Sequence, residues 1–334
     1  MSISARVAAH RASAVALALA LGACGGSSSK KGTASLTHAG TQPLAAARPV
    51  AGLRVTGTTA LPAAVQLPAV TADGRGVLAV GGLDAADASV ASIVLIGGSG
   101  TRIIGQLPLA LHDIGATEIE GQAFTFGGGE PGGASDAIFR IGASGAQLTG
   151  RLPAASSDLS AATIDHTAYV VGGYTVSAPL RTIVAFTPGG HAHVVATMPR
   201  PLRYASVAAV GGRMLIAGGT SGETAQRAIL SFDPASGVVR QIGELPRALT
   251  HAAGAALNGW FYVLGGRGEG LSDQTSAMLA IDPLSGAVHR AGTLPEALSD
   301  IGAATLGGHI IAVGGRNRAG TVSDRALTLA PVSR

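Results

Sequence analysis

The sequence predicts an all-β protein in which six four-stranded antiparallel blades close into a ring, a six-bladed β-propeller. Three observations lead to this fold class: a repeated pair of glycines, a proline at a fixed distance before each pair, and a content of 50 glycines in 334 residues. The glycine pairs are Gly81-Gly82, Gly127-Gly128, Gly172-Gly173, Gly218-Gly219, Gly265-Gly266 and Gly314-Gly315. The prolines are Pro62, Pro108, Pro153, Pro199, Pro246 and Pro295.

The spacing of these residues separates a constant core from variable loops. Each proline lies 19 residues before the first glycine of its pair, whereas successive pairs are 46, 45, 46, 47 and 49 residues apart. A fixed interval inside a variable period indicates one structural unit whose loops tolerate insertions. We interpret the glycines as structural, because they permit positive φ and close backbone approach where a strand ends.

Each repeat contains four segments with the pattern of strands. The first is rich in small residues, as at 113–117 and 300–304, and the second is the apolar run into the glycine pair, as at 260–264. The third and fourth, as at 228–234 and 238–242, are joined by a tight turn. A sheet with two apolar faces is stable only when both faces are buried. Blades that pack side by side around an axis bury both faces of each sheet. The small residues then fit the innermost strand, where the space between blades narrows.

The two ends of the repeat region predict how the ring closes. The last repeat stops after its third strand at residues 326–329. An additional strand at residues 53–57 leads into Leu61-Pro62, as the fourth strands do in the other repeats. We therefore expect residues 53–60 to complete the sixth blade.

The glycine pair after an apolar strand, at this period, resembles the kelch repeat over residues 53–334. The chain departs from that family's pattern on two strands. The usual tyrosine of the third strand is replaced by Phe139, Phe186, Phe232 or an aliphatic residue such as Ile281, and the usual tryptophan of the fourth strand is missing. The resemblance implies a diverged kelch-type propeller, and aromatic residues at only 3% of the chain imply an aliphatic core.

The first residues have the pattern of an export signal. Arg6, His10 and Arg11 precede an apolar run at residues 12–21, which is too short to span a bilayer. The run ends in Leu21-Gly22-Ala23-Cys24, which resembles the bacterial lipobox. That resemblance implies a diacylglycerol on the Cys24 thiol and cleavage of the chain before Cys24. The alternative is an ordinary signal peptide with an incidental cysteine.

These features predict three regions: a lipoprotein signal peptide at residues 1–23, a flexible linker at 24–48 and the propeller at 49–334. The linker is rich in Gly, Ser, Thr and Ala and has no apolar periodicity. Because Cys24 is the only cysteine, no internal disulfide can form. We expect an extracytoplasmic monomer, anchored to the bacterial cell membrane only through the lipid on Cys24.

Charge argues against a nucleic-acid partner. Apart from Arg6, Arg11, Lys30 and Lys31, the basic residues are 19 arginines, which equal the 19 acidic residues in number. The body therefore has a formal net charge near zero despite a sequence pI of about 9.7. A nucleic-acid binder needs a dense basic face, and interleaved neutral charge does not supply one.

Polar residues recur in register where the first strand of each repeat begins. Five residues past each proline the sequence has Leu67, Asp113, Asp158, Tyr204, His251 and Asp300, hereafter the mouth column. The start of the first strand and the loop after the glycine pair lie at the same end of an antiparallel blade. We therefore predict a binding face at one mouth of the channel, composed of His112, Asp113, Asp158, Arg203, Tyr204, His251, Asp300, Arg267 and Arg316.

Two other interpretations of the same column remain open. Asp and Ser at a strand start often accept hydrogen bonds from loose backbone N–H groups, which is a structural role. Three aspartates and a histidine converging on one axis can also hold a cation. The spacing alone does not support a metal site, so no metal and no cofactor are predicted, and no catalytic residue is assigned.

The leading functional hypothesis is a non-catalytic module that binds an unknown protein or glycan. It rests on the tether, the neutral body, the polar face and the absence of a complete catalytic motif. The kelch resemblance implies a rival, a sugar-processing enzyme of the sialic acid mutarotase type. A galactose oxidase type is excluded because that family needs a Tyr–Cys crosslink and the body has no cysteine. A scaffold for envelope assembly is the third possibility, because fold alone does not choose a function.

Overall fold

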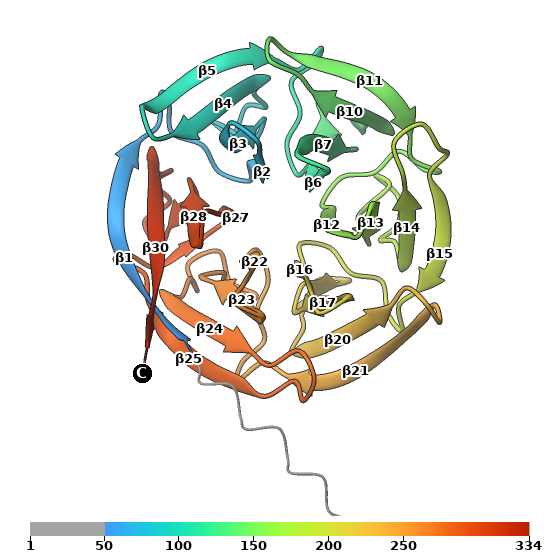
Figure 1. Ribbon diagram of the computed structural model, residues 1–334, viewed down its shortest axis with the longest axis vertical. Helices are drawn as coiled ribbons and strands as arrows, with labels where there is room; N and C mark the ends of the chain where they lie inside the picture. Colours follow the sequence, from blue (N-terminus) through green and yellow to red (C-terminus); the bar gives the residue numbers. More distant parts are fainter. Residues whose placement is uncertain (1–50, 334) are drawn as a thin grey trace, which may run out of the picture. The chain divides into compact units, whose positions relative to one another are not determined.

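The computed structural model describes residues 51–333, which form six four-stranded antiparallel blades around a common axis, with no helix in that range. Figure 1 looks down this axis, with the chain running once around the ring. The six-bladed all-β fold predicted from the repeats is confirmed. The signal peptide, Cys24 and the linker predicted at residues 1–48 lie outside the described residues.

Five blades take their four strands in chain order, from the axis outward. In blades 1 to 3 these strands are β2 (Ala69–Asp73), β3 (Gly76–Val80), β4 (Ser92–Gly97) and β5 (Gly100–Gln106); β6 (Gly115–Ile119), β7 (Gln122–Phe126), β10 (Ala137–Ile141) and β11 (Ala146–Arg151); and β12 (Ser160–Ile164), β13 (Thr167–Val171), β14 (Thr182–Phe186) and β15 (His193–Thr197). In blades 4 and 5 they are β16 (Ser206–Val210), β17 (Arg213–Ala217), β20 (Ala228–Asp233) and β21 (Val238–Glu244); and β22 (Ala253–Leu257), β23 (Trp260–Leu264), β24 (Ala277–Ile281) and β25 (Val288–Thr293).

Short two-stranded sheets involve the loops that follow three of the glycine pairs. Blade 2 carries β8 (Gly129–Glu130) with β9 (Gly133–Ala134), and blade 4 carries β18 (Thr220–Ser221) with β19 (Thr224–Ala225). In the sixth repeat β26 (Leu298–Ser299) pairs with β29 (Arg316–Asn317). These pairs extend the loops on the face that carries the mouth column, hereafter the mouth face.

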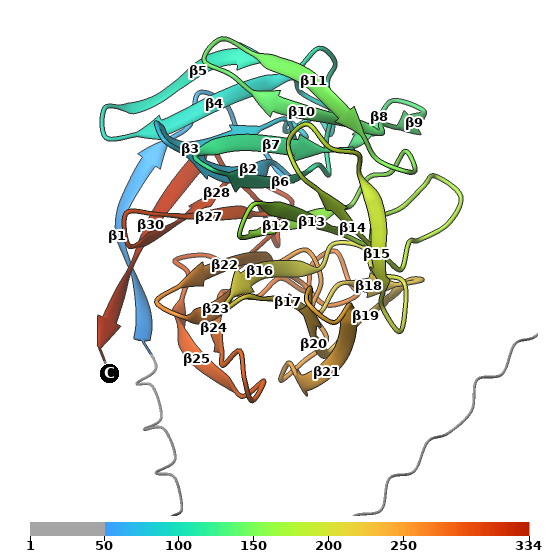
Figure 2. The same ribbon diagram turned by 45° about the vertical axis from the view of Figure 1, so that its right-hand side comes forward.

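The sixth blade joins the two ends of the propeller. Its strands, from the axis outward, are β27 (Gly302–Leu306), β28 (His309–Val313), β30 (Arg325–Ser333) and β1 (Ala51–Ala60). β1 pairs antiparallel with β30 from Ala51 opposite Ser333 to Ala60 opposite Arg325, and Figures 1 and 2 show the two strands side by side. The prediction that residues 53–60 complete this blade is confirmed.

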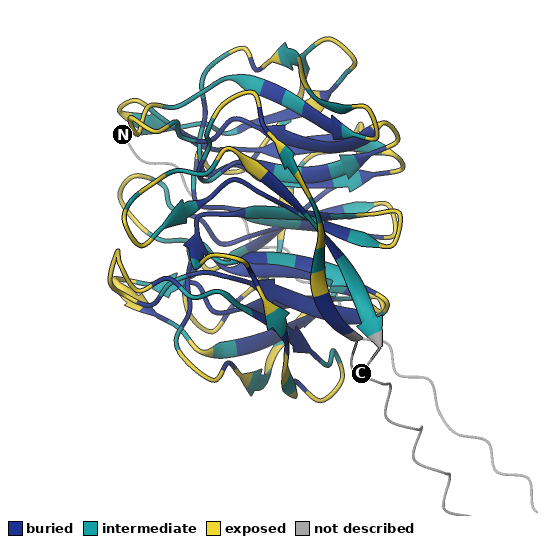
Figure 3. Ribbon diagram, turned by 90° about the vertical axis from the view of Figure 1, so that its left-hand side faces the viewer, coloured by how far each residue is buried: buried dark blue, intermediate teal, exposed yellow. Residues whose placement is uncertain are grey.

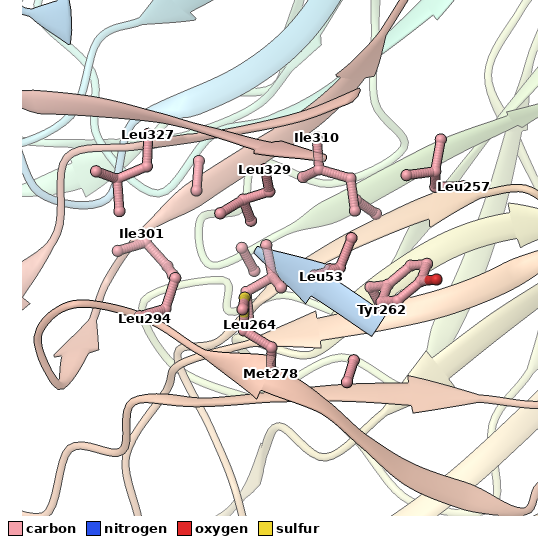
Figure 4. Packing of buried hydrophobic residues seen from close by; sticks show 14 of the residues in the cluster. Leu53, Leu257, Tyr262, Leu264, Met278, Leu294, Ile301, Ile310, Leu327 and Leu329 are labelled. Atoms are coloured by element: carbon pink, nitrogen blue, oxygen red, sulfur yellow. The ribbon is translucent and has the colours of Figure 1, made fainter. Parts of the chain in front are cut away.

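Buried residues follow the strands and exposed residues gather on the loops (Figure 3). The buried apolar clusters join residues of neighbouring blades. Figure 4 shows the cluster between blades 5 and 6, where Leu53 of β1 packs with residues from β23, β24, β28 and β30. These partners include Leu264, Met278, Ile310 and Leu329. The first strand of the chain thus stabilises the ring by burying apolar surface as well as by hydrogen bonding.

The innermost strands begin two residues later than the sequence pattern indicates. β6 starts at Gly115 and β27 at Gly302, whereas the predicted segments began at Asp113 and Asp300. The physical reason is backbone conformation, because Asp113 and Asp300 have φ of 53° and 60° and cannot belong to a strand. The mouth column therefore stands just before the first strand of each blade.

The glycine pairs connect each blade to the next. The N–H of the second glycine donates to a carbonyl in the loop before the next blade, as from Gly82 to Leu111 at 2.9 Å and from Gly219 to Leu249 at 2.9 Å. All six pairs make this bond, and Gly315 to Val65 at 2.9 Å joins blade 6 to blade 1. The first glycine of each pair has φ between 60° and 66°. A Cβ on it would collide with the same carbonyl that accepts the bond, as at Gly218 and Leu249.

Gly218→Ala should therefore destabilise the propeller far more than Gly98→Ala. The substitution at Gly218 combines a left-handed backbone conformation with a backbone collision, for a cost of about 2 kcal/mol or more. Gly98 has open space around it and no positive φ, so it is the matched control. Thermal unfolding should show a Tm lower by about 5 °C or more for Gly218→Ala. Equal Tm values for the two variants would contradict this role of the glycine pair.

Candidate functional site at the channel mouth

The mouth column forms a ring of left-handed residues at one end of the channel. All six members have φ between 53° and 60°, although none is glycine. Five of their backbone N–H groups donate to the carbonyl of the column residue one blade earlier, as from Asp158 to Asp113 at 2.9 Å and from Asp300 to His251 at 2.9 Å. No backbone N–H donates to the carboxylates of Asp113, Asp158 or Asp300 among the described residues. These bonds satisfy five of the six backbone N–H groups within the ring, which leaves the side chains available for other contacts.

The side chains of this ring enclose a small cavity. All six mouth-column residues line a space of about 140 Å³, and its walls continue along the innermost strands. Six of the wall residues, one from each blade, also line a second cavity of about 270 Å³ toward the opposite face. They are Val70, Ala116, Ala161, Val207, Gly254 and Ala303. The small residues predicted for the innermost strand thus form the wall of the channel.

Three carboxyl groups from three blades meet at the mouth. The side chains of Asp113, Asp158 and Asp300 are 6%, 3% and 10% exposed. Asp158 forms an ion pair with Nε of Arg203, and Ser299 Oγ donates to Asp300. The Oδ2 atom of Asp113 accepts from the Tyr204 hydroxyl at 3.3 Å, but its buried Oδ1 atom has no partner.

Burial raises the pKa of Asp113 well above its ordinary value, and the negative charges of Asp158 and Asp300 and a side-chain hydrogen bond with Asp158 raise it further. The protonated acid is therefore favoured, and it can donate one hydrogen bond as well as accept. The pKa of Asp300 is also raised by burial, against the opposing hydrogen bond from Ser299 and the charge of Arg267.

His251 links the mouth column to an arginine from the neighbouring loop. Its Nε2 atom lies 3.2 Å from Nη2 of Arg267, and its Nδ1 atom lies 3.0 Å from the Thr250 hydroxyl. A guanidinium only donates hydrogen bonds, so Nε2 must be unprotonated and the proton sits on Nδ1. The Thr250 hydroxyl accepts from Nδ1 and lies 2.7 Å from the Thr220 hydroxyl. The geometry thus requires a neutral imidazole.

The electrostatics of the site agree with this tautomer. Burial lowers the pKa of His251 well below its ordinary value, and the positive charges of Arg267 and Arg203 lower it further. Neutral His251, which can accept a proton, and protonated Asp113, which can donate one, therefore line the same cavity. A pair of this kind can hold or move a proton on a bound molecule.

Tyr204 stands at the centre of the site. Its ring stacks on His251 with centroids 3.7 Å apart, and its hydroxyl receives a hydrogen bond from Nη2 of Arg203 at 3.3 Å. The Arg203 guanidinium also lies over the ring of Tyr174, 4.3 Å from its centroid. These contacts fix the orientation of both charged and aromatic groups before any ligand arrives.

A second hollow adjoins the mouth cavity between the loops of blades 4 and 5, hereafter the loop cleft. It has a volume of about 300 Å³, and Arg203, Tyr204, His251 and Arg267 line it together with the exposed Leu271. Tyr204 and His251 line both spaces. A ligand in the loop cleft can therefore reach the channel.

The remaining predicted residues lie at the edges of the site. His112 is bonded through Nδ1 to the Ser89 hydroxyl at 2.9 Å, its Nε2 lies 3.8 Å from Asp113, and burial lowers its pKa. Arg316 belongs to the other side of the mouth, where its Nη1 lies 3.6 Å from Asp87. The compact part of the site therefore contains Asp113, Asp158, Arg203, Tyr204, His251, Arg267 and Asp300, whose Oδ1 lies 3.8 Å from Nε2 of His251.

Sequence reasoning missed Tyr174 and Thr220. Both directly follow a glycine pair, and each forms a backbone bridge with the residue just before a mouth-column member, Ser157 and Arg203 respectively. The position after the glycine pair was the available signal, because Arg267 and Arg316 occupy it in other repeats.

Comparisons with known proteins do not assign the chain to a family. No protein-family model matches the chain, and no curated protein matches it significantly. Within residues 51–333 no three His, Cys, Asp or Glu side chains are arranged to hold a metal ion. In the same range no helix is long and apolar enough to cross a membrane.

Asp113→Asn should stabilise the protein at neutral pH. Because folding raises the pKa of Asp113, stability is lost as pH rises from the unfolded pKa near 4 toward the folded one. The neutral amide removes that loss, for a gain on the order of 1 kcal/mol, or a Tm higher by about 2–4 °C at pH 7. The gain should shrink toward pH 4.

Asp158→Asn is the control, because it leaves the half-buried Arg203 cation without its partner and should lower the Tm at pH 7. A stabilisation by Asp113→Asn that does not change between pH 4 and pH 8 would refute the raised pKa.

Proposed function

We propose that this chain is a lipid-anchored, extracytoplasmic binding module of the kelch type that takes a polar ligand, such as a sugar unit of a glycan, at the channel mouth. The observation that carries the proposal is the unpartnered, buried Oδ1 atom of Asp113, which lies in a residue lining the mouth cavity. Leaving such an atom without a hydrogen bond costs about 1–3 kcal/mol, which a ligand hydroxyl or amide can recover on binding.

The surrounding network supports binding because it is fixed in advance. Asp158, Arg203, Tyr204 and His251 hold one another through hydrogen bonds, an ion pair and a ring stack. Side chains that are already ordered lose little conformational entropy when a ligand arrives. The joined mouth cavity and loop cleft offer the concave shape and few converging polar groups that are typical of small-ligand sites.

The anchored location is supported by the sequence alone. The segment Leu21-Gly22-Ala23-Cys24 has the lipobox pattern, and the Gly/Ser-rich segment after it has the composition of a tether. The sixfold glycine pair within the six-bladed fold supports the kelch assignment.

An enzyme that moves a proton on a bound sugar is the second candidate, of the mutarotase type. The pairing of a protonated Asp113 with a neutral His251 at one cavity favours it. Chemical conversion of a ligand that binds the site would separate this candidate from a module that only binds.

A thermal-shift screen tests the proposed binding. Residues 48–334 form one compact unit, so this part of the chain can be screened against neutral sugars, amino sugars and cell-wall fragments. A ligand at 100 times its dissociation constant stabilises by about 2.7 kcal/mol, or a Tm shift of about 5 °C or more. We expect His251→Gln to lose the shift and His191→Gln, an exposed histidine near the turn between β14 and β15, to keep it. Equal shifts in both variants would place the ligand elsewhere.

Cys24→Ser tests the anchor. The natural chain produced in a bacterial host should incorporate a labelled fatty acid and sediment with membranes, whereas Cys24→Ser should lose both properties. Membrane association that persists in the variant would refute anchoring through Cys24.

A further inference from the structure

Arg267 is the one guanidinium of the loop cleft without an acidic partner in the described residues. Arg203, which also lines the cleft, forms an ion pair with Asp158. On the same face, Arg247 pairs with Asp273 and Arg316 with Asp87. Arg267 instead contacts neutral His251 at 3.2 Å and the carbonyls of Gly268 at 3.4 Å and Glu269 at 3.3 Å. Within residues 51–333 Arg267 therefore forms no direct ion pair, although its charge acts on the nearby carboxyl of Asp300.

The loop that carries Arg267 is tied down by its own contacts. Arg267 and Thr250 exchange backbone hydrogen bonds at 2.9 Å, and Arg267 bridges to Gln274 across the loop. The Gln274 side chain donates to the Leu271 carbonyl at 2.7 Å, and the ion pair of Arg247 with Asp273 fixes the loop from outside. The guanidinium is therefore held at the edge of the cleft before any ligand arrives.

From these observations we infer that the ligand of this site carries a carboxylate group, which Arg267 binds in the loop cleft. The inference rests on the proposed function and specifies its ligand. A guanidinium presents two parallel N–H groups that match the two oxygens of a planar carboxylate. The shared wall of Tyr204 and His251 lets the rest of the ligand extend to Asp113.

The surrounding charges favour a monoanion over a phosphate. Glu223 and Glu269 line the same cleft, and neither lies within an ion-pair distance of Arg267. A doubly charged group would meet their repulsion with a single free guanidinium in compensation. A singly charged carboxylate meets less of this repulsion and needs only the one guanidinium of the cleft that has no ion-pair partner in the described residues.

Matched pairs of probes test this inference on residues 48–334. The pairs are glucuronate with glucose, galacturonate with galactose, and glutamate with glutamine, so that an acidic sugar and an acidic amino acid are distinguished. We expect the carboxylate member of at least one pair to bind about 10- to 100-fold more tightly, as a charge-assisted hydrogen bond predicts. Arg267→Gln should abolish that preference.

Arg240→Gln, an exposed arginine on β21, is the matched control and should keep the preference. Arg267→Lys should retain part of it, because the charge remains but the two parallel donors do not. The Tm of each unliganded variant checks that the fold is intact. If neutral and acidic members bind equally, or Arg267→Gln keeps the preference, the inference fails while the proposed function stands. If no probe of either kind binds, both fail.

Discussion

The structure depends on one repeated interaction, the hydrogen bond from the second glycine of each pair to a carbonyl in the loop before the next blade. It is made six times, and the bond from Gly315 to Val65 closes the ring. The first glycine of the pair must lack a side chain, because a Cβ there would occupy the place of the accepting carbonyl. The glycines therefore set the distance between blades, and the aliphatic side chains between the blades add the burial that stabilises this arrangement.

That spacing also creates the site. Once the loop before each blade is held by the previous glycine pair, the mouth-column residue is fixed in the left-handed region, and its N–H bonds to the ring rather than to a side chain. Non-glycine residues adopt this conformation at a cost, and such strain is often concentrated where function requires it. Here it directs Asp113, Tyr204 and His251 to the wall of one small cavity.

The chemistry of the site follows from which of its charged side chains have a partner of opposite charge. Arg203 neutralises Asp158, so the second buried carboxyl, that of Asp113, is favoured in its protonated form. Arg267 contacts His251 rather than a carboxylate, which requires the imidazole to be neutral and leaves the guanidinium without a direct ion-pair partner among the described residues. The mouth thus combines a neutral acid, a neutral base and one available cation, a combination suited to recognising a polar molecule of small negative charge.

The sequence by itself determined the six blades, the closure by residues 53–60 and the small-residue lining of the channel, because each follows from a local pattern repeated at a fixed interval. It also located the mouth column, but it placed Asp113 and Asp300 within strands, since a left-handed conformation of an aspartate leaves no mark in the apolar pattern. Only the tertiary structure decided which polar residues meet. Asp113, Arg203, Tyr204 and Arg267 come from repeats up to 154 residues apart in the chain. Their pairing depends on distances across the ring, and periodicity along one strand carries no information about those distances.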